Sequence, residues 1–371
     1  MKQGWEYKKI GNICNITTGK LDANAANEDG LYPFFTCSRI PLSINTYAYD
    51  CECILIAGNG DLNVKYYNGK FNAYQRTYIL QLKNDVNGVE MRYIFAFFNL
   101  YIEELRRKSI GGIIKYIKLG DLTNALLPLP DITTQLSIVS ELDKINELIR
   151  LKKEQLKDYD NLAQSIFYEM FGDPVENEKG WEVKKWKEVF NTILGKMLDK
   201  SKQINHLKQY KYLANMNVQW GYFDLKELRS MTFTDEELAK YELRNNDLLI
   251  CEGGDAGRCA IWKETDETIL FQKAIHRARL IDTDNADVVY IRYWMQFYKV
   301  NKGLKDYISK STIEHLTGDK LKRLPIPLPP LPLQHLFAQR IEQIERQKPA
   351  VQKSITDLET ILASRMQYWF E

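Results

Sequence analysis

The sequence is poor in the side chains that hold metal ions and disulfides. Its 371 residues include 4 histidines, which are scattered, and 6 cysteines, of which only Cys51 and Cys53 lie close together. No second close pair of cysteines is available to complete a zinc site, so we predict no bound metal. The cysteines are typical of small buried thiols in a reducing cytosol.

Long apolar runs are also missing. The N-terminal sequence MKQGWEYKKI has no apolar signal core, and no stretch approaches the roughly 18 apolar residues of a membrane-spanning helix. We therefore expect a cytoplasmic protein that makes no membrane contact. The net charge of +2 neither demands nor excludes a nucleic-acid partner, so any basic surface must be local.

Motifs of enzymes that act on nucleotides or nucleic acids are absent. No Gly-Lys pair is followed by Ser or Thr, which excludes a P-loop. An amino-methyltransferase needs an Asn/Asp-Pro-Pro-aromatic motif, and the only Pro-Pro follows Leu328. One nuclease pattern is left open: Asp173 precedes Glu182-Val183-Lys184, and these carboxylates could hold Mg²⁺, although a charged strand explains the same residues. We expect no catalytic residue and no cofactor bound by this chain.

The main feature that is present is an internal repeat. The offset between matching residues is 176 at Gly4 and Gly180, 194 at Asp61 and Asp255, and 199 at Gln135 and Gln334. The second copy therefore carries roughly 20 extra residues, near 191–243, and the length of each copy indicates a duplicated domain, not a solenoid. The matching segments are 4–9 with 180–185, 54–61 with 248–255, 74–76 with 271–273, and 129–135 with 328–334.

Each copy ends in a predicted long helix with an apolar seam. Residues at alternating spacings of four and three continue over about five heptads, which is typical of a coiled coil. We predict two long antiparallel helices, the first near 136–171, with a kink or short break in the second at Pro349. The alternative is that each helix packs only on its own domain. The seam residues that we expect at an interface are Leu142, Ile145, Ile149, Leu156, Ile341, Ile344, Val351 and Leu358.

The remaining pattern predicts an α+β protein of two tandem domains. Buried strands are expected at 53–57 and 247–251, an alternating strand at 76–82, and buried helices at 93–98 and 290–294. Proline-rich stretches precede both long helices, and a polar linker follows the first. We place the boundaries at 1–130 for the first domain, 131–172 for the first helix, 173–179 for the linker, 180–328 for the second domain and 329–371 for the second helix.

Both copies carry a glycine loop directly after a buried strand, and basic or amide side chains lie near it in the sequence. Such loops are either structural turns or contacts to a nucleic-acid backbone, and Gln and Arg can read adenine and guanine edges. Each side chain could equally be a solvated surface group. The candidate DNA-binding residues are Asn59, Lys65, Gln75, Arg76, Lys108 and Lys115 in the first copy, and Arg258, Gln272, Lys273, Lys310, Ser311 and Thr312 in the second.

These motifs resemble the specificity subunit of a Type I restriction–modification system. The resemblance is carried by the paired Gly-Trp-Glu-x-Lys-Lys openings, the two strand–glycine loops, and the stretches 109–135 and 311–334. It covers essentially the whole chain. It implies two target-recognition domains that each read half of an interrupted DNA site, and paired helices that set the gap between the halves.

The resemblance also implies partners. Two methyltransferase subunits would dock on the helices, restriction or translocase subunits could join them, and S-adenosylmethionine would sit on the methyltransferase. It assigns no base contact to a particular residue, because those residues differ with the target. Two other functions stay open from the sequence: a coiled-coil scaffold that does not touch DNA, and a self-contained restriction enzyme.

Overall fold

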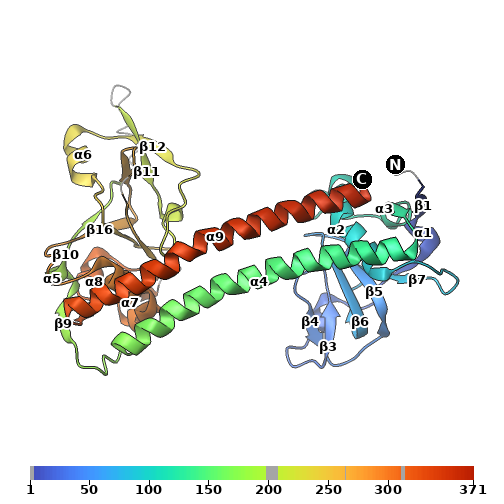
Figure 1. Ribbon diagram of the computed structural model, residues 1–371, viewed down its shortest axis with the longest axis horizontal. Helices are drawn as coiled ribbons and strands as arrows, with labels where there is room; N and C mark the ends of the chain where they lie inside the picture. The colour runs from blue at the N-terminus through green and yellow to red at the C-terminus, as the bar shows by residue number, and fades with distance from the viewer. Residues whose placement is uncertain (1–3, 198–207, 264, 311–313) are drawn as a thin grey trace. The chain divides into compact units, whose positions relative to one another are not determined.

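The computed structural model describes residues 4–197, 208–263, 265–310 and 314–371. The chain forms two compact units (Figure 1). Unit 1 consists of Met1–Gln155 together with Val351–Glu371, and unit 2 consists of Leu156–Ala350. Both units mix helices and strands, as the sequence predicts, and each contains part of both long helices.

Unit 1 is built on a six-stranded sheet with the order β2-β7-β5-β6-β3-β4, and a separate antiparallel pair joins β1 to β8. The short helices α1 (Ile10–Ile13) and α3 (Leu119–Thr123) flank the longer α2 (Met91–Lys108) in sequence. The strands are β1 (Glu6–Lys9), β2 (Cys14–Thr18), β3 (Tyr32–Phe35), β4 (Leu42–Ile44), β5 (Tyr49–Ala57), β6 (Val64–Ala73), β7 (Thr77–Leu82) and β8 (Leu126–Leu129).

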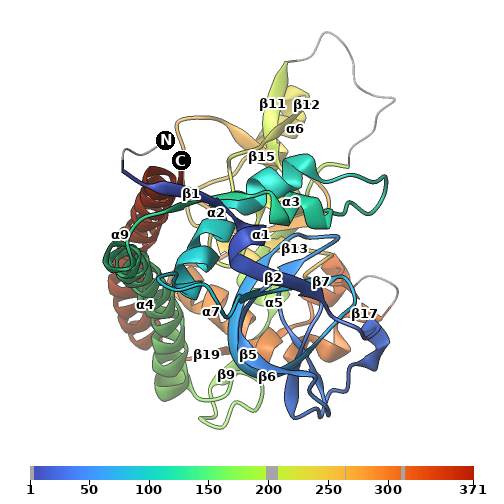
Figure 2. The same cartoon turned by 90° about the vertical axis from the view of Figure 1, so that its right-hand side faces the viewer.

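Strand β5 lies inside this sheet, and its second half, residues 53–57, is buried on both faces. Because side chains alternate along a strand, Ile54 and Ile56 join the core that contains α2, whereas Cys53 and Leu55 pack on the opposite face. Figure 2 shows α2 between the sheet and the first part of α4 (Ile132–Phe171). The sheet, α2 and α4 therefore make one layered core, and the loop that follows β5 is held on a rigid support.

Unit 2 repeats this plan with smaller sheets. Four strands follow the order β10-β16-β13-β14, three follow β12-β11-β15, and β9 pairs with β19 as β1 does with β8. The strands are β9 (Glu182–Lys185), β10 (Phe190–Leu194), β11 (Gln209–Leu213), β12 (Arg229–Thr232), β13 (Leu248–Cys251), β14 (Cys259–Ile261), β15 (Ile269–Phe271), β16 (Ile275–Leu280), β17 (Ser309–Lys310), β18 (Glu314–His315) and β19 (Pro325–Leu328). The helices are α5 (Trp186–Val189), α6 (Asp235–Tyr241), α7 (Val288–Val300) and α8 (Gly318–Leu321).

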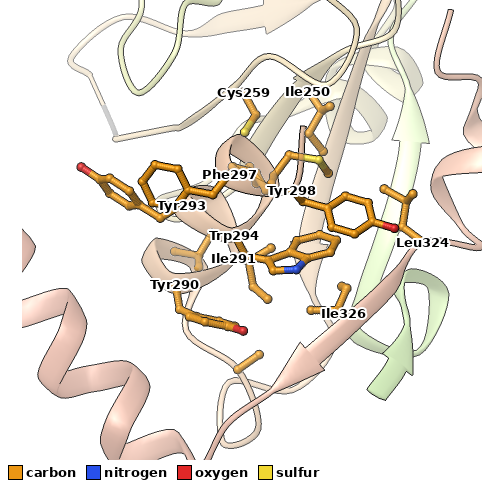
Figure 3. Packing of buried hydrophobic residues seen from close by; sticks show 14 of the residues in the cluster. Ile250, Cys259, Tyr290, Ile291, Tyr293, Trp294, Phe297, Tyr298, Leu324 and Ile326 are labelled. Carbon is orange, nitrogen blue, oxygen red and sulfur yellow. The ribbon is translucent and has the colours of Figure 1, made fainter. Parts of the chain in front are cut away.

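The core of unit 2 gathers around α7. Trp294, Tyr290 and Ile291 of this helix are almost fully buried, and they pack with Ile250 of β13 and Ile326 of β19 (Figure 3). Tyr290 also donates from its hydroxyl to the carbonyl of Pro327 at 2.7 Å. The predicted buried helix at 290–294 and the predicted strand at 247–251 are thus confirmed as two neighbours in one core.

The extra residues of the second copy lie in two connections. The segment between β11 and β12 has 15 residues (214–228), against 6 (36–41) between β3 and β4. The segment between β12 and β13 also has 15 (233–247) and contains α6, whereas β4 and β5 are joined by 4 residues (45–48). Both enlarged connections flank β12, an edge strand of its sheet, and the glycine loop follows β13 as its counterpart follows β5.

The two long helices, α4 and α9 (Leu331–Phe370), have 40 residues each. In unit 1 they run antiparallel, because Arg365 pairs with Glu141 near the start of α4 and Glu359 accepts from Lys153 at 2.8 Å further along. In unit 2 Lys348 pairs with Asp160 at 2.7 Å. Their seams are apolar, and the antiparallel pairing predicted from sequence is confirmed within each unit.

The sequence predicts a kink or a short break at Pro349, and the prediction of a break is wrong. Helix α9 continues through this residue without interruption. A proline removes its own N–H bond to the carbonyl four residues earlier, here that of Glu345, and the surrounding turns keep their bonds. Ile344 and Val351, on either side of Pro349, are both buried, so apolar packing holds the helix where one hydrogen bond is lost.

A glutamine at the start of each long helix is fully buried. Gln135 donates from Nε2 to the carbonyls of Pro130 at 2.8 Å and Gly88 at 3.0 Å, and its Oε1 accepts from the amide of Glu90 at 3.0 Å. Gln334 makes the corresponding bonds in unit 2. The repeated Leu-Pro and Gln motif therefore fastens the long helix to the start of the buried helix of the same unit.

We expect Gln135→Ala to lower the free energy of unfolding of unit 1 by about 2 kcal/mol, because it leaves backbone groups without their partner in a buried place. The matched control is Gln352→Ala, since Gln352 is exposed on α9 in the same unit. Denaturant unfolding, followed by hydrogen exchange in β7 and α2, measures both. Equal effects of the two variants on the free energy of unfolding would contradict this role of the buried glutamine.

Candidate nucleic-acid interface

Three segments of unit 1 meet where β5 ends. The amide of Gly58 donates to the carbonyl of Arg76 at 2.8 Å, and the carbonyl of Gly58 accepts from the amide of Ile117 at 3.0 Å. The amide of Gly60 donates to the carbonyl of Lys115 at 3.0 Å. A side chain at Gly58 would place its Cβ 2.4 Å from the carbonyl oxygen of Arg76, so this position requires glycine. We call residues 58–61, 74–76 and 110–118 the unit 1 loop cluster.

Unit 2 has the same arrangement around its own glycine loop. The amide of Glu252 donates to the carbonyl of Ala274 at 2.9 Å, and its carbonyl accepts from Leu316 at 2.7 Å. Gly253 and His315 form a β-bridge. We call residues 252–257, 272–274 and 314–316 the unit 2 loop cluster. The two glycine loops are thus structural turns that also bring a turn and a downstream segment together.

One side chain of the sheet supports each cluster from below, and it is half-buried in unit 1 and buried in unit 2. Tyr78 on β7 donates from its hydroxyl to the carbonyl of Ile117 at 3.3 Å. His276 on β16 occupies the matching place, with its Nε2 3.3 Å from the carbonyl of Leu316. Burial lowers the pKa of His276, so this ring is neutral and serves as a structural hydrogen-bonding group at physiological pH.

The candidate residues of the first copy fall into two groups. Arg76, Gln75 and Lys115 lie exposed in the unit 1 loop cluster, and Asn59 is half-buried beside them. Lys108 lies at the end of α2, where it pairs with Glu104. Lys65 lies on β6, half-buried, and burial lowers its pKa.

Lys108 and Lys65 are engaged inside unit 1. The amine of Lys108 lies 3.2 Å from the hydroxyl of Tyr101, and this hydrogen bond raises the pKa of Lys108. Lys65 donates to the side chain of Asn63. The exposed Arg76, by contrast, uses only its backbone carbonyl within the cluster.

The candidate residues of the second copy are also divided. Lys273 is exposed in the unit 2 loop cluster and Gln272 is half-buried beside it. Arg258 turns inward, where its Nη2 donates to the carbonyl of Asn215 at 2.9 Å. Lys310 lies on β17 opposite Glu314, and the predicted contacts Ser311 and Thr312 lie outside the described residues.

The seam residues of α4 and α9 lie at two levels of burial. Five are buried and three are half-buried, and they contribute to the helix packing inside the units. The buried ones are Leu142, Ile149, Ile341, Ile344 and Val351, and the half-buried ones are Ile145, Leu156 and Leu358. Exposed apolar side chains also remain on the helices, such as Leu148, Leu151 and Ile361.

Sequence reasoning missed an ion pair beside the unit 1 loop cluster. Arg39, in the loop between β3 and β4, donates from Nε to Asp61 Oδ2 at 2.6 Å and from Nη2 to Asp61 Oδ1 at 3.2 Å. Asp61 ends the glycine loop, and its repeated partner is Asp255, so the repeat could have drawn attention to the aspartate. No sequence signal connects it to an arginine 22 residues earlier.

The nuclease pattern of the sequence does not form a metal site in the described parts of the chain. Among residues 4–197, 208–263, 265–310 and 314–371, no group of three or more His, Cys, Asp or Glu side chains is placed to hold a metal ion. Asp173 of the nuclease pattern accepts instead from the amide of Val175 at 2.7 Å and from the side chain of Asn301 at 2.6 Å. Within the same ranges no helix is long and apolar enough to cross a membrane.

The chain matches the Type I restriction modification DNA specificity domain over residues 2–158 and again over 178–359. The chain belongs to this family. As a Type I DNA specificity chain, it carries one matching domain in each repeat, which agrees with the duplication seen in the sequence and in the two units.

Known specificity subunits are similar over most of their length. The chain is 24% identical to the Type I restriction enzyme EcoDI specificity subunit of Escherichia coli, over 95% of this chain and 84% of that protein. It is 22% identical to the MjaVIII specificity subunit of Methanocaldococcus jannaschii, over 92% of this chain and 86% of that protein. These relatives are named as specificity subunits, and the scaffold and self-contained nuclease alternatives gain no support.

Solved structures share the fold of this DNA specificity chain. The S subunit of a Type I restriction–modification system from M. genitalium superposes with a TM-score of 0.60 at 13% identity, over 100% of this chain and 98% of that one. A chain from a structure on complex assembly and conformational transition of the type I R-M system superposes with a TM-score of 0.61 at 17% identity, over 100% of this chain and 98% of that one. The two-domain α+β architecture with two long helices is therefore the fold of these subunits.

Proposed function

We propose that this DNA specificity chain reads an interrupted DNA site, with one half-site bound by the loop cluster of each unit. The observation that carries the proposal is the repeated convergence of a glycine loop, a tight turn and a downstream segment in both units. Exposed cations, Arg76 and Lys115 in unit 1 and Lys273 in unit 2, lie in these clusters. Such side chains neutralise phosphates and read base edges.

The chain works in this proposal as the non-catalytic part of a complex in the cytoplasm. The paired helices α4 and α9 bind two methyltransferase subunits, and restriction or translocase subunits join them. S-adenosylmethionine binds to the methyltransferase partner and supplies the methyl group there. Exposed apolar residues of the helices, such as Leu148 and Ile361, support the docking of partners. The two domains, linked in one chain, gain affinity for a split site through their high effective concentration.

The first test is the target itself. The chain is co-expressed with its methyltransferase subunit in a host that lacks modification, and methylated bases are mapped by single-molecule sequencing. We expect one motif made of two specified parts and an unspecified gap. Two unrelated motifs, or no methylation by a partner that binds S-adenosylmethionine and assembles with the chain, would contradict the proposal.

The second test is a loss of DNA affinity in the purified complex. We expect the triple substitution Arg76→Ala, Lys115→Ala and Lys273→Ala to weaken DNA binding at least tenfold and to lower the slope of log K against log salt by about 2 to 3. The control removes three other exposed lysines, Lys8, Lys187 and Lys226, which lie outside both loop clusters and both long helices. An unchanged affinity of the first triple variant would favour a scaffold.

A further inference from the structure

Asp61 holds the guanidinium of Arg39 from one side. The carboxylate accepts from Nε and from one N–H of Nη2, at 2.6 Å and 3.2 Å. Both side chains are well exposed, at 66% for Arg39 and 56% for Asp61. A guanidinium has five N–H donors in one plane, so this pairing leaves Nη1 and the second N–H of Nη2 free at the outer end of the side chain.

Those free donors have a defined chemical partner. Two parallel N–H groups at the end of an arginine match the N7 and O6 acceptors of guanine in the major groove, and this is the commonest specific contact between proteins and DNA. A pinned guanidinium loses less conformational freedom on binding than a free one. Asp61 therefore prepares Arg39 for a bidentate acceptor.

The loop of Arg39 is also fixed by hydrogen bonds between side chains and backbone carbonyls. Asn63 donates from Nδ2 to the carbonyl of Cys37 at 2.9 Å and to that of Asp61 at 2.8 Å, which joins the loop to the residues after the glycine turn. Cys37 Sγ lies 3.6 Å from the carbonyl of Arg76. Arg39 thus borders the unit 1 loop cluster, on the same side as the turn that carries Arg76.

The surrounding charges keep Asp61 ionised in this role. The hydrogen bond from Arg39 lowers the pKa of Asp61, and Arg106 adds to the effect at 3.8 Å. Arg106 is itself anchored, since its Nη2 donates to the carbonyl of Leu62 at 2.7 Å. Arg106 therefore helps to hold Asp61 in place, whereas the free N–H groups at the end of Arg39 are available to bind DNA.

Unit 2 uses the repeated aspartate differently. Asp255 accepts from the indole N–H of Trp220 at 2.9 Å and pairs with Lys299 on α7. Both partners are part-buried, so this carboxylate fastens the enlarged connection of unit 2 to its core. The outward-facing arginine is consequently a feature of unit 1, and it predicts a difference between the two half-sites.

We propose that Arg39, held by Asp61, reads one guanine in the half-site bound by unit 1, through parallel hydrogen bonds to N7 and O6. This inference rests on the proposed function and adds a specificity-determining residue and the base that it selects. A phosphate group offers the same paired acceptors, and the experiment distinguishes the two.

The experiment compares Arg39→Lys, Arg39→Ala and Asp61→Asn with the control Arg244→Lys, which changes an exposed, ion-paired arginine of unit 2. Complexes with the methyltransferase subunit are tested on duplexes that carry each base at every specified position. Arg39→Lys keeps the charge and loses the paired donors. We expect its preference for guanine to fall at least tenfold at one position of one half-site, with other positions unchanged. Asp61→Asn gives a smaller loss at the same position.

A modified base gives an independent readout. Replacing that guanine with 7-deazaguanine removes the N7 acceptor, so wild-type binding weakens and Arg39→Lys binding does not weaken further. Equal weakening at all positions in Arg39→Ala, with a salt slope lower by about 1, would mark a phosphate contact and overturn the inference. So would unchanged specificity in Arg39→Lys. If the wild-type complex shows no interrupted motif, the proposed function itself fails.

Discussion

Phe370→Ala is expected to destabilise unit 1 strongly while leaving the stability of unit 2 unchanged. Phe370 lies in the last turn of α9, is only 8% exposed, and packs on Tyr93 and Phe97 of α2 with ring centroids 5.1 and 6.0 Å apart. Removing a buried phenylalanine costs about 3 to 5 kcal/mol. Domains are stable by about 5 to 15 kcal/mol, so this loss takes a large share of the stability of unit 1.

The measurement is denaturant unfolding combined with hydrogen exchange, so that each unit is followed by its own peptides. Tyr368→Ala is the matched control, because Tyr368 is 57% exposed in the same turn, and its effect should stay below about 1 kcal/mol. Phe171→Ala, at the end of α4, should have the mirrored effect on unit 2. If Phe370→Ala alone reduced the hydrogen-exchange protection of both units, this result would contradict the conclusion that each unit has its own core.

Gly19→Ala should damage both the stability of unit 1 and its DNA binding. A Cβ at this position would lie 2.2 Å from the carbonyl oxygen of Ala73 and 2.4 Å from that of Tyr74, and backbone cannot yield as a side chain can. The turn that carries Gln75 and Arg76 must shift. We expect a loss of about 3 kcal/mol in the free energy of unfolding, as for severe overpacking, and a DNA affinity at least tenfold lower.

The control for this substitution is Gly120→Ala. Gly120 lies in α3, and the nearest atom to its added Cβ is Asn124 Nδ2 at 3.8 Å, so alanine fits and favours the helix slightly. Calorimetry and DNA titration of the complex measure both variants. If Gly19→Ala kept both a normal DNA affinity and a normal melting temperature, the turn at Ala73 and Tyr74 would not depend on a glycine at position 19.

Much of the fold could be predicted because its signals are local. The seam spacing specifies α4 and α9, and apolar runs specify β5, β13 and the buried helix α7. Cys14, Cys53, Cys251 and Cys259 are buried, as their apolar neighbours in sequence predict, whereas Cys37 and Cys51 are half-buried, contrary to the prediction of six buried thiols. In each case the residues that determine the element lie within the element itself or beside it in the sequence.

The site could be predicted less well from the sequence, because its contacts join residues that are far apart in the chain. Nothing near Arg258 in sequence indicates that its guanidinium turns toward Asn215, and nothing near Arg39 indicates Asp61. The outcome at Pro349 has the same origin, since burial of neighbouring seam residues offsets the missing hydrogen bond. Long-range packing decides such cases, and the repeat only showed which positions to compare.

The composition of unit 1 also affects the order in which the chain can fold during synthesis. Its core needs Phe370 and the rest of the last turn of α9, so this core cannot close until that turn has left the ribosome. Unit 2 is a continuous segment, Leu156–Ala350, and is complete earlier in translation. A nascent chain that terminates before Val351 would present a finished second domain and an unfinished first one, and it could not read both halves of a site.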